Sequence, residues 1–238
     1  MQQKIIEASS YEQLSNLCAE AMLDCIANKP DAVICLATGH SPRGAYREFV
    51  QRARSTQTNI RQVTFVKLDE WLGLPMDDPV TSEDFLQREI LQPLNIQAEQ
   101  YIAFQSDPSD PLTECKRIAA ELESRGPIDL MILGVGQNGH IGLNEAAEAL
   151  TAGPHIADLA PTTRNHAMLA AREVPLLQGV TVGVGDIFAA RRVILLVTGG
   201  GKTAALAAFD QGTITTCWPV TLLHLHPDLL CIIDRSHV

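Results

Sequence analysis

The sequence lacks the features that mark membrane, secreted and nucleic-acid-binding proteins. None of its apolar stretches approaches the roughly 20 residues that cross a bilayer. The N-terminal segment MQQKIIEASS has no apolar core of the kind found in signal peptides. Positive charge is scarce, because 18 Lys and Arg stand against 28 Asp and Glu, a formal net charge of −10. Such a chain repels nucleic acid phosphates over most of its surface, so we predict a cytoplasmic protein with neither a nucleic acid nor a membrane partner.

Metal-type and redox-type cysteine spacings are also missing. The six cysteines include no C-x-x-C pair, and several lie inside apolar runs. We interpret them as reduced core residues and expect no metal site. The 238 residues are 46% hydrophobic and 19% charged, which is typical of a protein with a large core.

Short apolar runs alternate with longer amphipathic segments. In the first amphipathic segment, Ser10 and Gln13 form a capping-box pattern that predicts the start of a helix. Further helices are expected over about 41–54, 82–92 and 111–125 and from about 202. The apolar runs predict strands at 32–37, 62–71, 128–134, 191–199 and 229–234. This order predicts a single α/β domain over residues 1–238, a doubly wound, mostly parallel, Rossmann-like sheet with helices on both faces.

The turn after the strand at 32–37 is a candidate anion site, because ligands of such sheets bind at the carboxyl ends of strands. Thr38, Gly39, His40 and Ser41 stand there before a helix, whose first N–H groups lack intrahelical partners. We expect Ser41 to be the N-cap and Pro42 the first helical residue. An ordinary capped turn is the structural alternative.

A second candidate anion site is the turn VTGGGK, which ends at Lys202. It fails the P-loop pattern because position 196 is Leu where that pattern requires Gly. A lysine at a glycine-rich helix start can still hold a phosphate, although a solvated lysine is the simpler interpretation.

Asp69 and Glu70 lie at the carboxyl end of the strand at 62–71, where it leaves the sheet, and are candidates for a general base. Strand alternation predicts Lys67 and Asp69 on one face and Glu70 on the other. Asp69 is therefore the candidate that we expect to face a cleft, against the alternative that both acids are simply solvated.

The segment LGVGQNGHIGLNE, residues 133–145, allows two interpretations. Its glycines satisfy G-x-G-x-x-G, but the dinucleotide fingerprint requires a helix directly afterwards and an acid at the end of the next strand. Here the helix is interrupted, and GPHIADLAP around Asp158 makes a poor strand. The alternative is an acid–base pair in which Glu145 orients the imidazole of His140.

Taken in order, ATGHSPRGAY, TFVKLDEWLGLP, IDLMILGVGQNGHIGLNE, VTVGVG and LLVTGGGKTAAL resemble the glucosamine-6-phosphate deaminase/isomerase family over about residues 30–233. The resemblance implies an enzyme that needs no metal or organic cofactor and converts an amino-sugar 6-phosphate and water into a ketose 6-phosphate and ammonia. It implies that Asp69 moves the proton from C2 to C1, and that His140 with Glu145 assists ring opening. It also implies that Gly39, His40, Ser41 and Lys202 hold the phosphate.

Two positions depart from the family pattern. Asn138 stands where some members have an Asp that completes the histidine relay, and His155 stands where many glucosamine enzymes have an Arg that clasps the phosphate. The histidine resembles the galactosamine-6-phosphate branch, which favours galactosamine 6-phosphate, giving tagatose 6-phosphate, over glucosamine 6-phosphate, giving fructose 6-phosphate. A 6-phosphogluconolactonase-type hydrolase and a non-enzymatic sugar-phosphate sensor remain alternatives. Family members occur as monomers and hexamers, so a homo-oligomer is one of the states that the resemblance allows.

Overall fold

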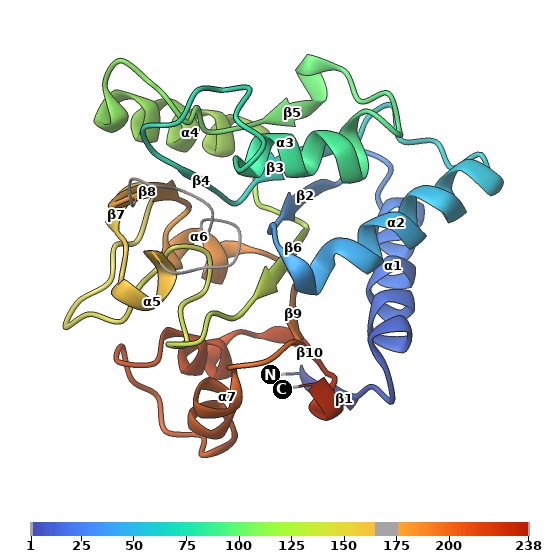
Figure 1. Ribbon diagram of the computed structural model, residues 1–238. Coiled ribbons are helices and arrows are strands. Elements are labelled where there is room, and N and C mark those ends of the chain that lie inside the picture. The colour runs from blue at the N-terminus through green and yellow to red at the C-terminus, as the bar shows by residue number, and fades with distance from the viewer. Residues whose placement is uncertain (1, 165–175, 238) are drawn as a thin grey trace.

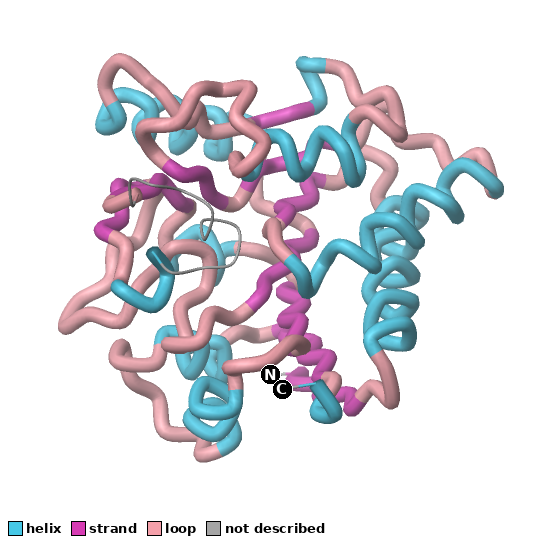
Figure 2. Tube along the Cα trace, in the orientation of Figure 1, coloured by secondary structure: helices cyan, strands magenta, loops and turns pink. Residues whose placement is uncertain are grey.

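The computed structural model describes residues 2–164 and 176–237, and it centres on a seven-stranded parallel sheet (Figure 1). Figure 2 shows these strands running through the middle of the molecule with helices around them. The elements in chain order are β1 (Gln2–Glu7), α1 (Tyr11–Asn28), β2 (Val33–Leu36), α2 (His40–Ser55), β3 (Thr64–Lys67), β4 (Asp69–Trp71), α3 (Ser82–Leu86), the π-helical turn η1 (Gln87–Leu91), η2 (Ala98–Gln100), β5 (Tyr101–Ile102), α4 (Pro111–Arg125), β6 (Leu130–Gly134), β7 (His155–Asp158), α5 (Pro161–Arg164), β8 (Gln178–Thr181), α6 (Val184–Ala189), β9 (Val193–Val197), α7 (Thr203–Asp210), η3 (Pro219–Leu225), β10 (Asp228–Ile233) and η4 (Arg235–His237).

The order of the strands places a binding crevice at the middle of the sheet. The order is β1-β10-β9-β6-β2-β3-β5. After β1, which lies at the outer edge beside β10, the chain adds strands outward from β2 in one direction and from β6 in the other. In sheets of this kind, ligands bind outside the carboxyl ends of the strands at the point where the direction changes. That point lies between β2 and β6, which are hydrogen-bonded neighbours.

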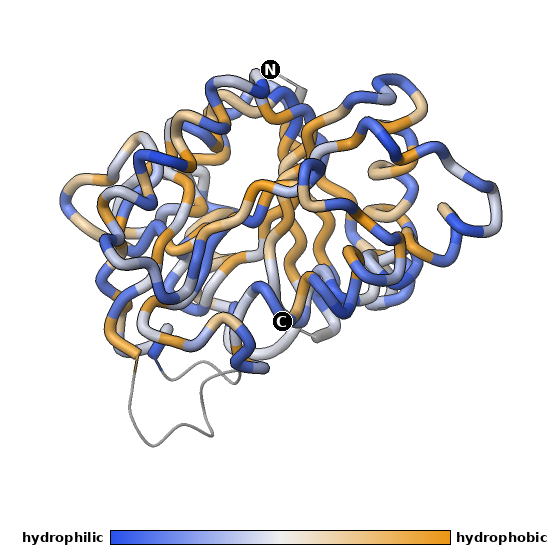
Figure 3. Tube along the Cα trace, turned by 90° about the horizontal axis from the view of Figure 1, so that it is seen from above, coloured by the Kyte–Doolittle hydropathy of each residue, from blue (hydrophilic) through white to orange (hydrophobic). Residues whose placement is uncertain are grey.

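Helices cover both faces of the sheet, as predicted. Ile34 and Leu36 of β2 pack in one core cluster with α1, α2 and α3. Their neighbours Val33 and Cys35 pack in another with α4, α6 and α7. The alternation of side chains along each strand therefore supplies two cores, and Figure 3 shows hydrophobic residues concentrated along the central strands.

The main predicted elements are confirmed. All five predicted strands contribute to the central sheet, and Ser10 caps α1 by accepting a hydrogen bond from the backbone N–H of Gln13. The helix predicted at 82–92 consists of α3 followed by the π-helical turn η1. The edge strand β1 was not predicted, because its polar sequence QQKIIE carries little hydrophobic signal. Among the described residues, none of the helices combines the length and hydrophobicity needed to cross a bilayer.

A second, antiparallel sheet of order β4-β8-β7 stands beside the main one and was not predicted. The run at 62–71 is not one strand, since it breaks at Leu68 between β3 and β4. The interpretation of GPHIADLAP as a poor strand was wrong, because His155–Asp158 forms β7. The pairing of β7 with β8 supplies the partner that its own sequence pattern does not reveal.

Candidate active site

A cavity of about 590 Å³ lies at the carboxyl ends of the central strands. Each of the four turns singled out in the sequence contributes to its wall. Of the predicted site residues, those that line the cavity are Thr38, Gly39, His40, Ser41, Asp69, His140 and Lys202. The cavity thus collects residues from positions 38 to 202 into one space.

One end of the cavity is formed by the start of α2. Gly39 is the N-cap of this helix, and its φ of 105° lies in a region that glycine adopts most easily. The prediction of Ser41 as the N-cap and Pro42 as the first helical residue was wrong, because the helix begins two residues earlier, at His40. The hydroxyl of Ser41 instead accepts a hydrogen bond of 3.0 Å from Lys202 Nζ.

This end of the cavity is electropositive. The N-terminus of α2 carries a partial positive charge, and the ammonium group of Lys202 adds a full one. Burial lowers the pKa of Lys202 to about 8. Burial and the charge of Lys202 also lower the pKa of His40. A bound anion would relieve both effects, which makes this end suited to a phosphate group.

Asp69 provides a carboxylate elsewhere in the same cavity. Its Oδ1 lies 3.5 Å from the hydroxyl of Ser82. Burial, together with the neighbouring charge of Glu70, raises the pKa of Asp69 to about 7. The group can therefore take up and release a proton near neutral pH, as a general base must.

Glu70 does not lie on the opposite face from Lys67, so that part of the alternation argument was wrong. The chain turns out of the main sheet at Leu68, and Lys67 Nζ contacts Oε2 of Glu70 at 2.8 Å. Both side chains are fully buried, and Lys67 Nζ also donates to Glu83 at 2.8 Å. Glu70 accepts backbone N–H groups at the start of α3, including that of Ser82. This buried network fixes the backbone on which Asp69 stands.

His140 is held by a small group of polar side chains. Its Nδ1 lies 3.4 Å from Oε2 of Glu145 and 3.2 Å from the hydroxyl of Thr163. Asn138 does not bind the imidazole; its amide donates to Glu145 Oε2 at 2.6 Å. Burial alone would raise the pKa of Glu145, but bonds from His140, Thr163 and Asn138 outweigh it and lower the pKa to about 2. Glu145 is thus an ionised carboxylate that can orient the imidazole.

The glycines of the G-x-G-x-x-G segment make room for this histidine. A Cβ atom on Gly136 would lie 2.2–2.4 Å from atoms of the His140 ring. Gly139 has a φ of 79° and turns the chain back toward the cavity. The residues after β6 form turns rather than the helix that a dinucleotide site requires. The glycine spacing therefore makes room for the His140 ring and does not form a dinucleotide site.

His155 is not among the residues that line the cavity. It lies on β7, where its Nδ1 is 3.0 Å from the backbone oxygen of Gly153.

The sequence analysis missed Trp71, Gln137, Thr163 and Thr198, which do line the cavity. No local pattern marks Gln137 and Thr198, because a lone Gln or Thr in a loop resembles any surface residue. Trp71 on β4 and Thr163 on α5 reach the cavity only through the fold. Within residues 2–164 and 176–237, the structure shows no cluster of three His, Cys, Asp or Glu placed to hold a metal ion.

Comparison with known proteins gives a consistent result. Residues 7–231 match the family described as glucosamine-6-phosphate isomerases/6-phosphogluconolactonase. The chain is 42% identical over 232 residues to the Escherichia coli K12 protein named "Putative deaminase AgaI", covering 98% of this chain and 92% of that protein. It is 33% identical to glucosamine-6-phosphate deaminase 1 of Bacillus subtilis, covering 98% of this chain and 97% of that one.

Among solved structures, a monomeric glucosamine-6-phosphate deaminase superimposes with a TM-score of 0.91 at 32% identity, covering 98% of both chains. The 6-phosphogluconolactonase of Trypanosoma brucei shares the fold, with a TM-score of 0.78 at 18% identity over 99% of this chain and 97% of that one. The chain belongs to the glucosamine-6-phosphate isomerase/6-phosphogluconolactonase family.

Proposed function

We propose that this protein is an amino-sugar-6-phosphate deaminase that couples aldose–ketose isomerisation to the release of ammonia. The observation that carries the proposal is that one cavity is lined by a carboxylate of raised pKa, by His140 and by an electropositive helix start. Glu145 lies behind the histidine and contacts its ring. The similarity to proteins named glucosamine-6-phosphate deaminase supports the proposal.

The phosphate of the substrate would bind at the start of α2, beside Ser41 and Lys202. A phosphate carries roughly −1.5 to −2 charge near neutral pH, which suits the positive end of the cavity. It lies several bonds from the reacting carbons, so its binding energy can orient C1 and C2 without taking part in the chemistry.

His140 would open the sugar ring by moving a proton from the C1 hydroxyl to the ring oxygen. Glu145 would hold the imidazole in the required tautomer and stabilise its protonated form. Asn138 would act on the imidazole indirectly, because its amide holds the Glu145 carboxylate by a hydrogen bond.

Asp69 would then take the proton from C2 and return it to C1. This transfer converts the open-chain amino aldose into the imine of the ketose. Water adds to the imine carbon and ammonia leaves, so each turnover consumes one water molecule and produces one ketose 6-phosphate. A single positioned acid–base group of this kind typically contributes about 10²–10⁴-fold to the rate.

Galactosamine 6-phosphate is the favoured substrate, because the histidine at position 155 resembles the galactosamine-6-phosphate branch of the family. The product would then be tagatose 6-phosphate. Because His155 lies outside the cavity lining, any effect on the choice of epimer would be indirect. Glucosamine 6-phosphate would give fructose 6-phosphate by the same steps. We expect the reaction to take place in the cytoplasm, where the six free cysteines would stay reduced.

A coupled ammonia-release assay tests the proposal. The enzyme is supplied in parallel with galactosamine 6-phosphate, glucosamine 6-phosphate and 6-phosphogluconolactone. Ammonia from either amino sugar supports a deaminase, and the ratio of the two kcat/KM values identifies the epimer. Acid release from the lactone without ammonia would instead indicate a lactonase. Binding of the amino-sugar phosphates without turnover would indicate a sensor.

A further inference from the structure

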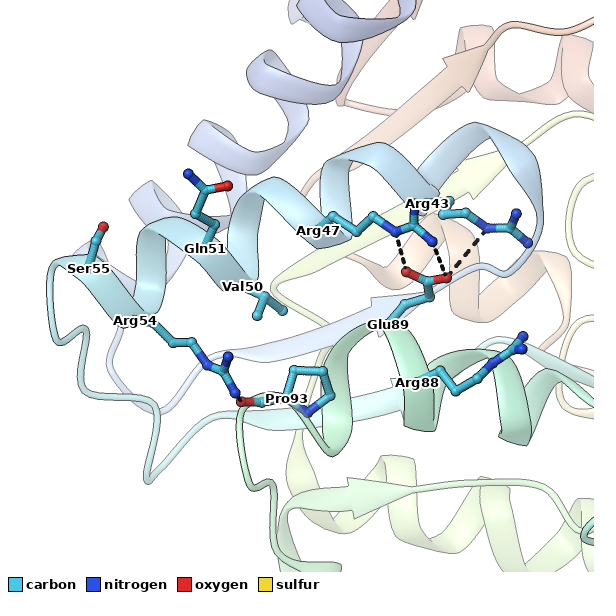
Figure 4. A pocket seen from close by; sticks show the side chains of 9 residues that line it. All are labelled: Arg43, Arg47, Val50, Gln51, Arg54, Ser55, Arg88, Glu89 and Pro93. Atoms are coloured by element: carbon cyan, nitrogen blue, oxygen red, sulfur yellow. Dashed lines mark hydrogen bonds and ion pairs between the residues drawn. The ribbon is translucent and has the colours of Figure 1, made fainter.

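A groove of about 930 Å³ lies between α2 and the α3–η1 segment, apart from the active-site cavity. Figure 4 shows four arginines around it, Arg43, Arg47 and Arg54 from α2 and Arg88 from η1. Its lining shares no residue with that of the active-site cavity. The chain carries only 18 basic residues and a net charge of −10, so four arginines in one groove are a marked local concentration of positive charge.

The nearby carboxylates balance only part of this charge. Glu89, which is 9% exposed, contacts Arg47 Nε at 2.8 Å and Arg43 Nε at 3.5 Å. Asp84 contacts Arg88 Nε at 3.1 Å. Among these described groups, two carboxylates thus stand against four guanidinium groups, which leaves an excess of two positive charges.

The two ends of the groove are held differently. At one end, Arg43 and Arg47 converge on Glu89, and Arg43 also lies over the ring of Phe85 at 5.3 Å. At the other end, Arg54 donates to the backbone oxygen of Pro93 (Figure 4). Because that oxygen carries no formal charge, the charge of Arg54 is not neutralised by this contact.

The distance between the two ends of the groove indicates how far apart the anionic groups of a ligand would lie. Arg47 and Arg54 are seven residues apart on α2, which corresponds to about 10 Å along a helix. Guanidinium groups match phosphate oxygens with paired hydrogen bonds, and each Arg here has N–H donors beyond those used. The groove volume lies in the range typical of small-molecule sites, about 300–1,000 Å³. Its wall includes part of a π-helical turn, a feature frequent at functional sites.

We propose that this groove binds a small metabolite that carries a phosphate group at each end, of the sugar bisphosphate class. One phosphate lies beside Arg43, Arg47 and Arg88, and the other lies beside Arg54. This site is independent of the active-site cavity and of the reaction proposed for it.

Isothermal titration calorimetry with fructose 1,6-bisphosphate as the probe tests the proposal. The titration uses Lys202→Ala protein, which lacks the ammonium group at the electropositive end of the active-site cavity. We expect one bound molecule per chain and an affinity at least about tenfold above that for fructose 6-phosphate, which has a single phosphate. Binding of both probes with equal affinity would contradict a site for two phosphates.

Substitutions in the same Lys202→Ala protein locate the site. Arg47→Gln and Arg54→Gln should each weaken binding of the bisphosphate by about tenfold or more, since each removes charge-assisted hydrogen bonds. Arg61→Gln is the matched control, because Arg61 is an exposed arginine outside the groove, and this change should leave the affinity unaltered.

Thermal unfolding of each variant shows whether it is folded. Absence of binding to Lys202→Ala, or unchanged binding to a folded Arg47→Gln/Arg54→Gln double variant, would overturn the proposal. Inactivity of the wild type toward amino-sugar phosphates would overturn the proposed function but leave this test intact.

Discussion

Replacing Asp69 with Asn should make the protein more stable at alkaline pH while removing its activity. Burial and the charge of Glu70 raise the pKa of Asp69 from 3.8 to about 7, so the folded state disfavours its ionised form. That change corresponds to at most about 4 kcal/mol. The side chain opens onto the cavity, where solvent screens part of the cost, so we expect a gain of about 1–3 kcal/mol at pH 8.

The sign of this effect depends on pH. Because the pKa of Asp69 is higher in the folded state, the folded state binds the proton more tightly than the unfolded state does. The resulting contribution to the free energy of unfolding is fully present below about pH 4 and is lost as pH rises through about 7. The advantage of Asp69→Asn over wild type should therefore be larger at pH 8 than at pH 5. Urea denaturation at both values measures it, with the exposed Asp107→Asn as a control that should show no such gain. Equal or lower stability of Asp69→Asn at pH 8 would refute the reasoning.

Three further predictions concern catalysis. Lys202→Ala should raise KM by about tenfold to a hundredfold because it removes a charge-assisted phosphate contact, and an unchanged KM in steady-state assays would place the phosphate elsewhere. Gly136→Ala should lower kcat about a hundredfold by displacing the His140 ring, whereas Gly153→Ala, which lies outside the cavity lining and whose added Cβ meets no atom within 4 Å, should be nearly normal. A pH profile of kcat/KM should rise through about 7 as Asp69 ionises and fall above about 8 as Lys202 loses its proton; a flat profile would contradict these assignments.

Sequence reasoning predicted the central sheet well because its strands are buried on both faces. Runs such as that of β9, Val193–Val197, consist entirely of buried hydrophobic residues and stand out without any partner. β1 and β7 are polar or short, and they become strands only because β10 and β8 lie beside them. Their existence depends on contacts distant in sequence, which no local pattern contains.

The candidate site was predictable where a residue follows a strand in a distinctive turn. Asp69, His140 and Lys202 belong to such turns, and the structure brings them into one cavity. Thr163 was missed because it belongs to the short helix α5 and approaches His140 only through the fold. The error at Ser41 has a local cause, because Gly39 with its positive φ ends the turn and serves as the N-cap two residues earlier.

Turnover by Asp69→Asn tests the central claim most directly, which is that this carboxylate carries the proton between the C2 and C1 atoms of an amino-sugar phosphate. Ammonia release is measured with saturating substrate, and binding of the ketose 6-phosphate product to the same protein is measured by calorimetry. The account predicts ammonia release at least about a hundredfold slower than wild type, with product affinity close to that of wild type. Near-normal ammonia release from the variant would contradict it.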